Sequence, residues 1–285
     1  MYPIIISVFI YFLIRFLKTV YKFNNPIIIS VDGNIGSGKS TLIQILKESN
    51  IFPNYTFIDE PISDWTEIKD ANGINLLGNF YTDKKRWSYS FQNFAFITRS
   101  RDLLHTIEKF DSQDIFRMIK NFWNNKKNVC FTERSTLTDR YVFAEMLYDS
   151  GHMSKLEWAM YMEWYNLFKE KLKIDHVIYI KTNPEISFER VNKRSRSEEK
   201  SLSQDYLIEL HTKHEKWLSL ENNVLTINGN VDFETEEANR INIIDKIKKY
   251  IENIDSEVDD NSNEWINSKK LSNIYLNLVN NKYKF

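Results

Sequence analysis

The sequence predicts an α/β fold in which a five-stranded parallel sheet carries helices on both faces, with an arginine-rich lid at one edge. Five short apolar runs alternate with longer helical patterns, and the first run leads into a glycine-rich loop that opens a helix. Strands that alternate with helices in this way form parallel sheets covered on both faces. The chain has 285 residues, which is enough for one large α/β body with appendages.

The glycine-rich loop is the clearest motif. It follows an apolar β-branched run that begins at Ile27, and it has the spacing Gly-x4-Gly-Lys-Ser that is typical of a phosphate-binding loop between a strand and a helix. The loop comprises Gly33, Asn34, Ile35, Gly36, Ser37, Gly38, Lys39, Ser40 and Thr41. We expect its backbone N–H groups to face an anion, Lys39 to neutralise phosphates and Ser40 to hold Mg²⁺. The motif predicts nucleoside triphosphate binding without naming the reaction.

Composition narrows the possible functions. The formal net charge is −1, so the chain lacks the basic field that sequence-independent binding of polymeric nucleic acid needs. Its single cysteine, Cys130, cannot form an intramolecular disulfide or a cysteine-built zinc site. We therefore expect a reducing compartment, the cytoplasm.

The amino terminus is strongly apolar from residue 2 to residue 17. Its uncharged stretch of about a dozen residues is shorter than the ~20 that span a bilayer, so a membrane anchor and an extra packed helix both stay open. A secretory signal peptide is not expected, because no basic segment precedes the run. We divide the chain into an apolar segment at 1–25, a kinase-like domain at 26–254, and a carboxyl-terminal part at 255–285. The last part consists of a polar linker at 255–263 and a short terminal helix or tail at 264–285.

The other elements follow in order. Strand candidates lie at 55–59, 129–132, 176–180 and 224–227, and long helical patterns lie at 86–110, 158–172, 205–220 and 234–254. On the helix at 86–110, Gln92 and Arg99 are seven residues apart and so share one face, which suits either a pocket wall or a solvated stripe. The aromatic stripe on the helix at 158–172 is expected to be core or subunit interface.

Two acids terminate predicted strands. Glu60 precedes Pro61 after the second strand, and Glu133 begins Glu133-Arg134-Ser135 after the third. Ligands of parallel sheets bind outside the carboxyl ends of the strands, so both acids should meet the phosphate loop in one cleft. There, Glu60 could accept the proton of an acceptor hydroxyl, Glu133 could hold Mg²⁺ beside Ser40, and Arg134 could bridge donor and acceptor. Triphosphate hydrolysis stays open at this level.

An arginine-rich stretch follows the fourth strand. Arg190, Arg194 and Arg196 begin on a helix and continue into a loop, which indicates either a lid that clamps phosphates or a solvated loop.

Five motifs in this order resemble the deoxyribonucleoside kinase family, and its deoxycytidine and deoxyguanosine kinase branch in particular. They are GNIGSGKST at 33–41, DEP at 59–61 with the following Trp65, Tyr81 with RWSYSFQNFAFITRSR at 86–101, ERSTLTDRYVFAE at 133–145, and RVNKRSRSEE at 190–199 with YLIELHTKHEKWL at 206–218. The resemblance covers about 26–229. It implies transfer of the γ-phosphoryl of ATP or another nucleoside triphosphate to the 5′-hydroxyl of a deoxynucleoside for nucleotide salvage, with Mg²⁺, by a homodimer.

The resemblance also implies residue roles. Glu60 matches the general base, Glu133 the metal-associated acid and Arg134 the arginine beside it. The positions expected to contact substrate are Trp65, Leu77, Tyr81 and Glu199 (the last two at the sugar 3′-hydroxyl), Phe91 and Phe143 (around the base), Gln92 (on the base edge), and Arg99 with Asp139. Arg190, Arg194 and Arg196 match the lid.

The charged pair Arg99 and Asp139 favours deoxycytidine, deoxyadenosine or deoxyguanosine over thymidine, because thymidine-preferring relatives carry apolar residues there. Ala95 resembles the deoxycytidine enzyme. The chain departs from the family pattern in a shorter stretch between Glu60 and Tyr81 and a longer one between Arg101 and Glu133.

Two alternatives compete with this interpretation. A thymidylate-type nucleoside monophosphate kinase shares the phosphate loop and an Asp-Arg-Tyr sequence like that at 139–141, but the motifs at Glu60 and Glu133 disfavour it. A non-catalytic kinase-like subunit, anchored through residues 2–17, would be expected to lose Lys39, Glu60 or Arg134, and all three are present.

Overall fold

The computed structural model describes residues 2–49, 51–52 and 55–263. Two compact units, Met1–Asn239 and Arg240–Phe285, divide the chain. The division at 25 and 254 that we expected from the sequence stays a prediction. The expected terminal helix or tail at 264–285 lies outside the described residues.

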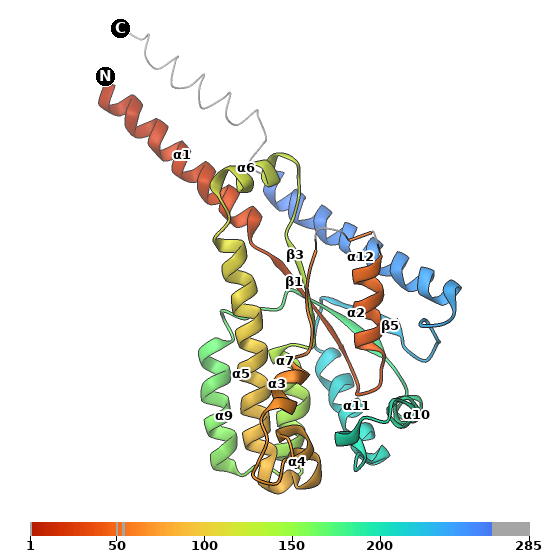
Figure 1. The fold of residues 1–285 in the computed structure, drawn as a ribbon. Coiled ribbons are helices and arrows are strands. Elements are labelled where there is room, and N and C mark those ends of the chain that lie inside the picture. The colour runs from red at the N-terminus through yellow and green to blue at the C-terminus, as the bar shows by residue number, and fades with distance from the viewer. Residues whose placement is uncertain (1, 50, 53–54, 264–285) are drawn as a thin grey trace. The chain divides into compact units, whose positions relative to one another are not determined.

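The first unit is built on a five-stranded sheet with the strand order β2-β3-β1-β4-β5 (Figure 1). The strands are β1 (Ile27–Gly33), β2 (Thr56–Ile58), β3 (Val129–Glu133), β4 (His176–Lys181) and β5 (Val224–Asn228). Every neighbouring pair is parallel. All five predicted strands and the predicted α/β class are therefore confirmed. The central strand β1 is buried from Ile28 to Gly33, as an apolar strand covered on both faces should be.

Helices connect the strands. Those of the first unit are α1 (Tyr2–Asn24), α2 (Lys39–Glu48), α3 (Ile62–Glu67), α4 (Leu76–Thr82), α5 (Lys84–Asp111), α6 (Ile115–Trp123), α7 (Thr136–Thr138), α8 (Glu145–Asp149), α9 (Lys155–Phe168), α10 (Pro184–Arg194) and α11 (Gln204–Leu218). In Figure 1, α5 and α9 lie on one side of the sheet and α2 on the other. A π-helical turn at Asp139–Ala144 joins α7 to α8.

Helix boundaries differ from the predicted ones where capping decides them. The helix predicted at 158–172 is α9 and begins at Lys155, because Ser154 and Glu157 form a capping box. Its aromatic stripe is divided: Tyr161 and Tyr165 are buried, whereas Trp164 is exposed. The helix α6 was not predicted.

The stretch 255–263, where we expected a polar linker, is helical. The helix α12 (Glu237–Asn263) continues through it. This stretch is acidic and polar but contains no proline or glycine, so no residue in it breaks a helix.

The apolar amino terminus is helical. The carboxyl half of α1 contacts α6, where Phe16 meets Phe122 and Trp123 edge to face and Phe23 meets Phe122 at 5.2 Å. Its other half is exposed. Within the described part of the chain, no helix combines the length and apolar character needed to cross a membrane.

Candidate functional site

A cleft of about 720 Å³ opens at the carboxyl edge of the sheet. The phosphate loop contributes Ile35, Gly36, Gly38, Lys39, Ser40 and Thr41 to its wall. The strand-end residues Glu60, Glu133 and Arg134 line the same cleft. The sequence-based expectation that the loop and both acids share one cleft is therefore confirmed.

Two glycines of the loop are required by space and backbone conformation. Gly36 has φ 76°, and a Cβ added there would lie 2.4 Å from the Ser187 carbonyl oxygen. Gly38 has φ 98°, and a Cβ there would lie 2.7 Å from the Phe233 ring. Both φ values are in the left-handed region that glycine adopts without strain. The loop is thus curved so that its N–H groups and the start of α2 can meet an anion.

Lys39 is buried at the floor of the cleft. Its Nζ donates to the Asn34 carbonyl oxygen at 2.7 Å. Burial, aided by the nearby Arg134 guanidinium, lowers the pKa of Lys39 to about 7. Glu133 and Glu60 offset part of this effect. A phosphate in the loop would add a further negative charge beside the Lys39 amine and favour its protonated form.

Glu60 lies between two guanidinium groups. Its Oε1 is 3.1 Å from Arg134 Nε and 3.2 Å from Arg99 Nη2. Burial opposes ionisation of Glu60, but Arg134 and Arg99 outweigh it and hold the pKa of Glu60 below its ordinary value. The carboxylate is therefore ionised at neutral pH and able to accept a proton.

Glu133 occupies a different environment. Its Oε1 accepts a hydrogen bond from Ser40 Oγ at 2.7 Å. Burial, followed by repulsion from Glu60, raises the pKa of Glu133. Two oxygen ligands of the type that Mg²⁺ prefers thus lie side by side at the phosphate loop. Over the described ranges, no three His, Cys, Asp or Glu side chains gather closely enough to hold a metal ion by themselves.

The backbone at Arg134 is strained. Its φ is 62°, in the left-handed region that a long side chain rarely adopts. The Arg134 N–H donates to the Val31 carbonyl oxygen at 3.0 Å, and its carbonyl accepts from Thr132 Oγ1 at 3.0 Å. These bonds to the two central strands hold the strained turn, and the guanidinium faces the cleft. Strain of this kind concentrates at functional sites.

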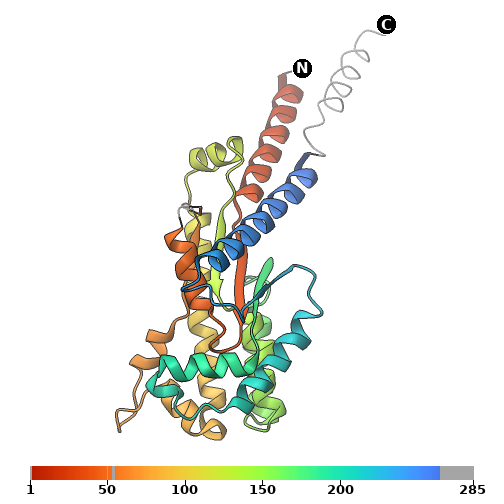
Figure 2. The same ribbon diagram turned by 90° about the vertical axis from the view of Figure 1, so that its right-hand side faces the viewer.

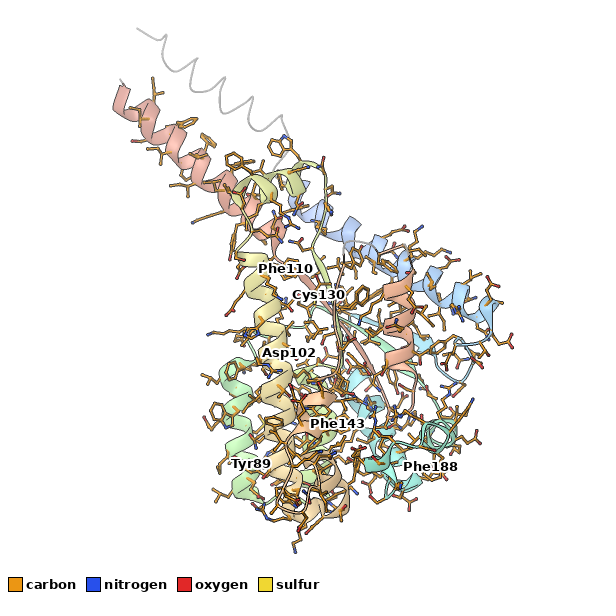
Figure 3. All side chains as sticks on the ribbon, viewed as in Figure 1. Tyr89, Asp102, Phe110, Cys130, Phe143 and Phe188 are labelled. Carbon is orange, nitrogen blue, oxygen red and sulfur yellow. The ribbon has the colours of Figure 1, made fainter. Side chains whose placement is uncertain are left out.

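The far end of the cleft is aromatic. Phe91 stacks on Phe80 with centroids 4.5 Å apart and meets Trp65 edge to face. The guanidinium carbon of Arg134 lies 4.7 Å from the ring centroid of Phe143, which is labelled in Figure 3. Phe91 and Phe143 both line the cleft, together with Leu77 and Trp65. Flat apolar walls of this kind suit a planar ring.

Gln92 is the polar group among these walls. Its side chain is 2% exposed and lines the cleft. No described residue donates a hydrogen bond to its Oε1. A buried amide oxygen without a partner is costly, so its position indicates that a ligand completes it. The alternative of a solvated stripe on this helix is wrong, because Arg99 is buried as well.

Arg99 ties the acids of the site together. Its Nε lies 3.0 Å from Asp139 Oδ2, and its Nη1 donates to the Glu133 carbonyl oxygen at 2.8 Å. Burial raises the pKa of Asp139 despite this ion pair. Asp139 begins the π-helical turn, which displaces its side chains relative to those of a regular helix.

The arginine-rich stretch also lines the cleft. Arg194 and Arg196 pair with Glu199 at 2.6 and 3.0 Å. Arg190 donates to the carbonyl oxygens of Gly229 and Val231. Tyr81 is buried nearby, and burial followed by the charge of Glu199 raises the pKa of its phenol. The three predicted lid arginines therefore line the cleft, although Arg194 stays exposed to solvent.

Three predicted residues of the loop, Gly33, Asn34 and Ser37, do not reach the cleft surface. Asn34 instead donates to the Leu207 carbonyl oxygen and holds the loop against α11. All the other site residues predicted from the sequence line the cleft.

Several lining residues were missed. They are Ile62, Phe80, Lys193, Tyr206 and the stretch 230–235. The stretch follows β5, so its place at the carboxyl edge of a parallel sheet was a signal that could have identified it. Tyr206 begins the motif at 206–218, which was a signal for it, and its hydroxyl has no partner in the described part of the chain.

Known proteins resemble this chain over most of its length. The family model described as deoxynucleoside kinase matches residues 29–252. A Fowlpox virus protein named "Probable deoxycytidine kinase" is 39% identical over 233 residues, which cover 78% of this chain and 87% of the relative. Deoxycytidine kinase 2 of Gallus gallus is 34% identical over 250 residues (78% and 89%), and mitochondrial deoxyguanosine kinase of Xenopus laevis is 34% identical over 248 residues (78% and 89%). The chain belongs to the deoxynucleoside kinase family, whose members are ATP-dependent phosphotransferases.

Proposed function

We propose that the protein transfers the γ-phosphoryl group of ATP to the 5′-hydroxyl of a deoxynucleoside in nucleotide salvage. The observation that carries this proposal is the amide oxygen of Gln92. It is buried in the same cleft as the phosphate loop and accepts no hydrogen bond from the described residues. A triphosphatase for mechanical or signalling work has no use for such a group, whereas a base edge would complete its hydrogen bonds.

The charged pair beside Gln92 supports deoxycytidine as the preferred acceptor, ahead of deoxyadenosine and deoxyguanosine, and thymidine last. Asp139 uses Oδ2 for Arg99, which leaves Oδ1 to accept an N–H from an exocyclic amine. Thymine would present a carbonyl oxygen there and would be repelled. Deoxycytidine is also in the names of two of the relatives described above.

The reaction needs a base and cations that respond to charge. Glu60 accepts the proton as the 5′-oxygen forms its bond to the γ-phosphorus and the bond from that phosphorus to the β–γ bridging oxygen breaks. Arg134 and Lys39 neutralise the charge that develops on the transferring oxygens and on the ADP leaving group. Arg134 contacts both Glu60 and the Phe143 ring, which gives it a fixed direction into the cleft.

Mg²⁺ fits the paired oxygens of Ser40 and Glu133. A magnesium ion commonly takes one or two protein ligands and completes its octahedron with phosphate oxygens and water. Once bound, it would neutralise the β- and γ-phosphates.

The sugar and the donor have candidate partners as well. Tyr81 and Glu199 line the cleft beside Arg194 and are suited to bind a 3′-hydroxyl. The three lid arginines are suited to bind the donor phosphates. Since Glu199 already pairs with two of them, sugar and phosphate binding would be linked through one carboxylate.

The test is turnover of the four deoxynucleosides with ATP and Mg²⁺. We expect deoxycytidine to have the highest kcat/KM and thymidine the lowest. Replacing Arg99 with Met together with Asp139 with Leu should raise the thymidine-to-deoxycytidine ratio of kcat/KM at least tenfold while lowering both values, because Arg99 also orients Glu60. Activity on a nucleoside monophosphate alone would overturn the proposed acceptor.

We also propose a homodimer formed through α9. Its exposed apolar residues are Leu156, Met160, Trp164 and Leu167. Their spacing places them on one helix face, as expected of a helix-to-helix interface. Replacing Trp164 with Glu should convert a dimer to a monomer in light scattering, and a monomeric parent protein would contradict the proposal.

Residues 2–17 are proposed to contact a membrane from the cytoplasmic side. Support for the membrane contact comes from the exposed apolar side chains of α1. The cytoplasmic side is supported by Cys130, which is free and buried in β3. Removal of the first 22 residues should abolish membrane recovery and leave turnover unchanged. A parent protein that stays in the soluble fraction would contradict this contact.

A further inference from the structure

We propose that α1 and α6 together form a docking surface for an anionic lipid bilayer. This inference rests on the proposed membrane contact and deepens it, because it names the lipid charge and adds a second helix. Figures 1 and 2 show α1 extending away from the sheet, with α6 beside its carboxyl half.

The outer half of α1 is apolar on every side. Its exposed large residues are Ile5, Ile6, Val8, Phe9, Ile10, Tyr11, Phe12, Leu13 and Ile14. Figure 3 shows side chains standing off this half in all directions. A protein groove would cover one face of a helix, whereas lipid surrounds an inserted helix. At 1.5 Å per residue the ten residues from 5 to 14 extend ~15 Å, which reaches into one leaflet of a hydrocarbon core ~30 Å thick.

Contacts with α1 fix the position of α6. Phe16 meets Trp123 at 5.5 Å, and Asn24 Nδ2 donates to the Met118 carbonyl oxygen at 3.0 Å. The indole of Trp123 is thereby held where the apolar run of α1 ends. Trp123 and Phe116 are 68% and 77% exposed and lie seven residues apart, on one face of α6. Exposed tryptophan at that level is typical of a protein at the boundary between headgroups and hydrocarbon.

Positive charge surrounds this aromatic level. The exposed basic residues of the two helices and of the turn after α6 are Lys18, Lys22, Arg117, Lys120 and Lys126. The sequence contains no Asp or Glu before Asp32 and none between Asp114 and Glu133. Two exposed acids at the junction of α5 and α6, Asp111 and Asp114, accept hydrogen bonds from the Tyr21 hydroxyl and the Phe116 N–H. The chain as a whole has a net charge of −1, so this basic cluster is local, and it matches an anionic surface.

The test is co-sedimentation of the full chain with vesicles of phosphatidylcholine, and with vesicles of phosphatidylcholine mixed with phosphatidylserine. We expect binding to the mixed vesicles to be much the stronger and to weaken as salt increases. Replacing Lys18, Lys22 and Lys120 with Gln should weaken that binding about 10²-fold, at about fivefold per cation. Replacing the exposed Lys155, Lys169 and Lys171 with Gln, at and just beyond α9, gives a control of equal charge that should bind as the parent does.

The contribution of α6 is tested by Trp123→Ser, which should weaken vesicle binding at least tenfold with deoxynucleoside turnover unchanged. Equal binding to both kinds of vesicle, or an unchanged Trp123 variant, would overturn the composite anionic surface while leaving an apolar contact through α1 in place. Self-association through α1 without vesicle binding would overturn both. If the parent protein turned over no deoxynucleoside, the proposed kinase function would be refuted instead.

Discussion

Replacing Glu60 with Gln tests the central step of the proposed reaction. The amide keeps an oxygen where Oε1 lies beside Arg134 and accepts from Arg99, so the two guanidinium groups keep a partner and the cleft should keep its shape. The amide cannot take up a proton at neutral pH. Loss of a general base lowers a rate by 10²–10⁴-fold, equivalent to ~3–5 kcal/mol of barrier. Because the two arginines hold the pKa of Glu60 low, it is a weak base, and we expect about 10²-fold.

The assay is steady-state deoxycytidine phosphorylation, with ATP affinity measured separately. We expect kcat to fall about 10²-fold and ATP affinity to change by less than threefold. Glu67→Gln, an exposed acid of the neighbouring α3, is the matched control and should behave as the parent does. Equal kcat values for the Glu60 variant and the parent would refute the role of this carboxylate.

The pH dependence follows from the same charges. A group with a lowered pKa is ionised above that pKa and becomes protonated as the pH falls through it. Activity that depends on ionised Glu60 should therefore be constant across neutral pH and be lost only below about pH 4.5, the ordinary value of a glutamate. An acid limb from this group near pH 6 would contradict the two-arginine environment.

Three further predictions concern base recognition, the donor site and the core. Gln92→Leu should raise the KM for deoxycytidine at least tenfold with a smaller change in the KM for ATP, measured in the same kinetic assay; equal effects on both substrates would contradict base recognition. Since Lys39 has a pKa of about 7 in the free protein, ATP binding at pH 8 should take up close to one proton, and at pH 6 almost none, as measured by calorimetry in buffers of different ionisation enthalpy. No proton uptake at pH 8 would mean that the Lys39 side chain is already protonated before ATP binds. Tyr161→Phe should leave the free energy of unfolding unchanged or raise it by up to about 1 kcal/mol in thermal melts, because the buried Tyr161 hydroxyl has no partner among the described residues. A loss greater than 1 kcal/mol would reveal a bond that the structure does not contain.

Much of the site could be predicted from the sequence because it is built at strand ends. A parallel sheet brings the residues after β1, β2 and β3 to one edge whatever their separation in sequence, so Glu60 and Glu133 meet the phosphate loop by topology alone. Gln92 and Arg99 shared a face because a helix repeats every 3.6 residues. Deciding between a pocket wall and a solvated stripe required the burial of both side chains.

Other features depend on contacts that no local pattern encodes. The left-handed backbone of Arg134 is held by Val31 and Thr132, and nothing in Glu133-Arg134-Ser135 announces it. The loop at 230–235 mixes polar and apolar residues and lacks a motif, and it joins the site only because β5 is paired with β4. Helix α6 is short and follows an acidic turn, and its contacts with α1 give it a defined place.

The sequence by itself determined the α/β class, the phosphate loop and the residue types of a phosphoryl-transfer site, because spacing and periodicity express backbone geometry directly. The tertiary structure decided which charges meet. It placed two arginines beside Glu60 and left an oxygen of Gln92 without a partner among the described residues. It also set α6, which carries Arg117 and Lys120, beside the apolar α1. Electrostatic energies depend on distance and burial, and both are fixed only when distant segments pack together.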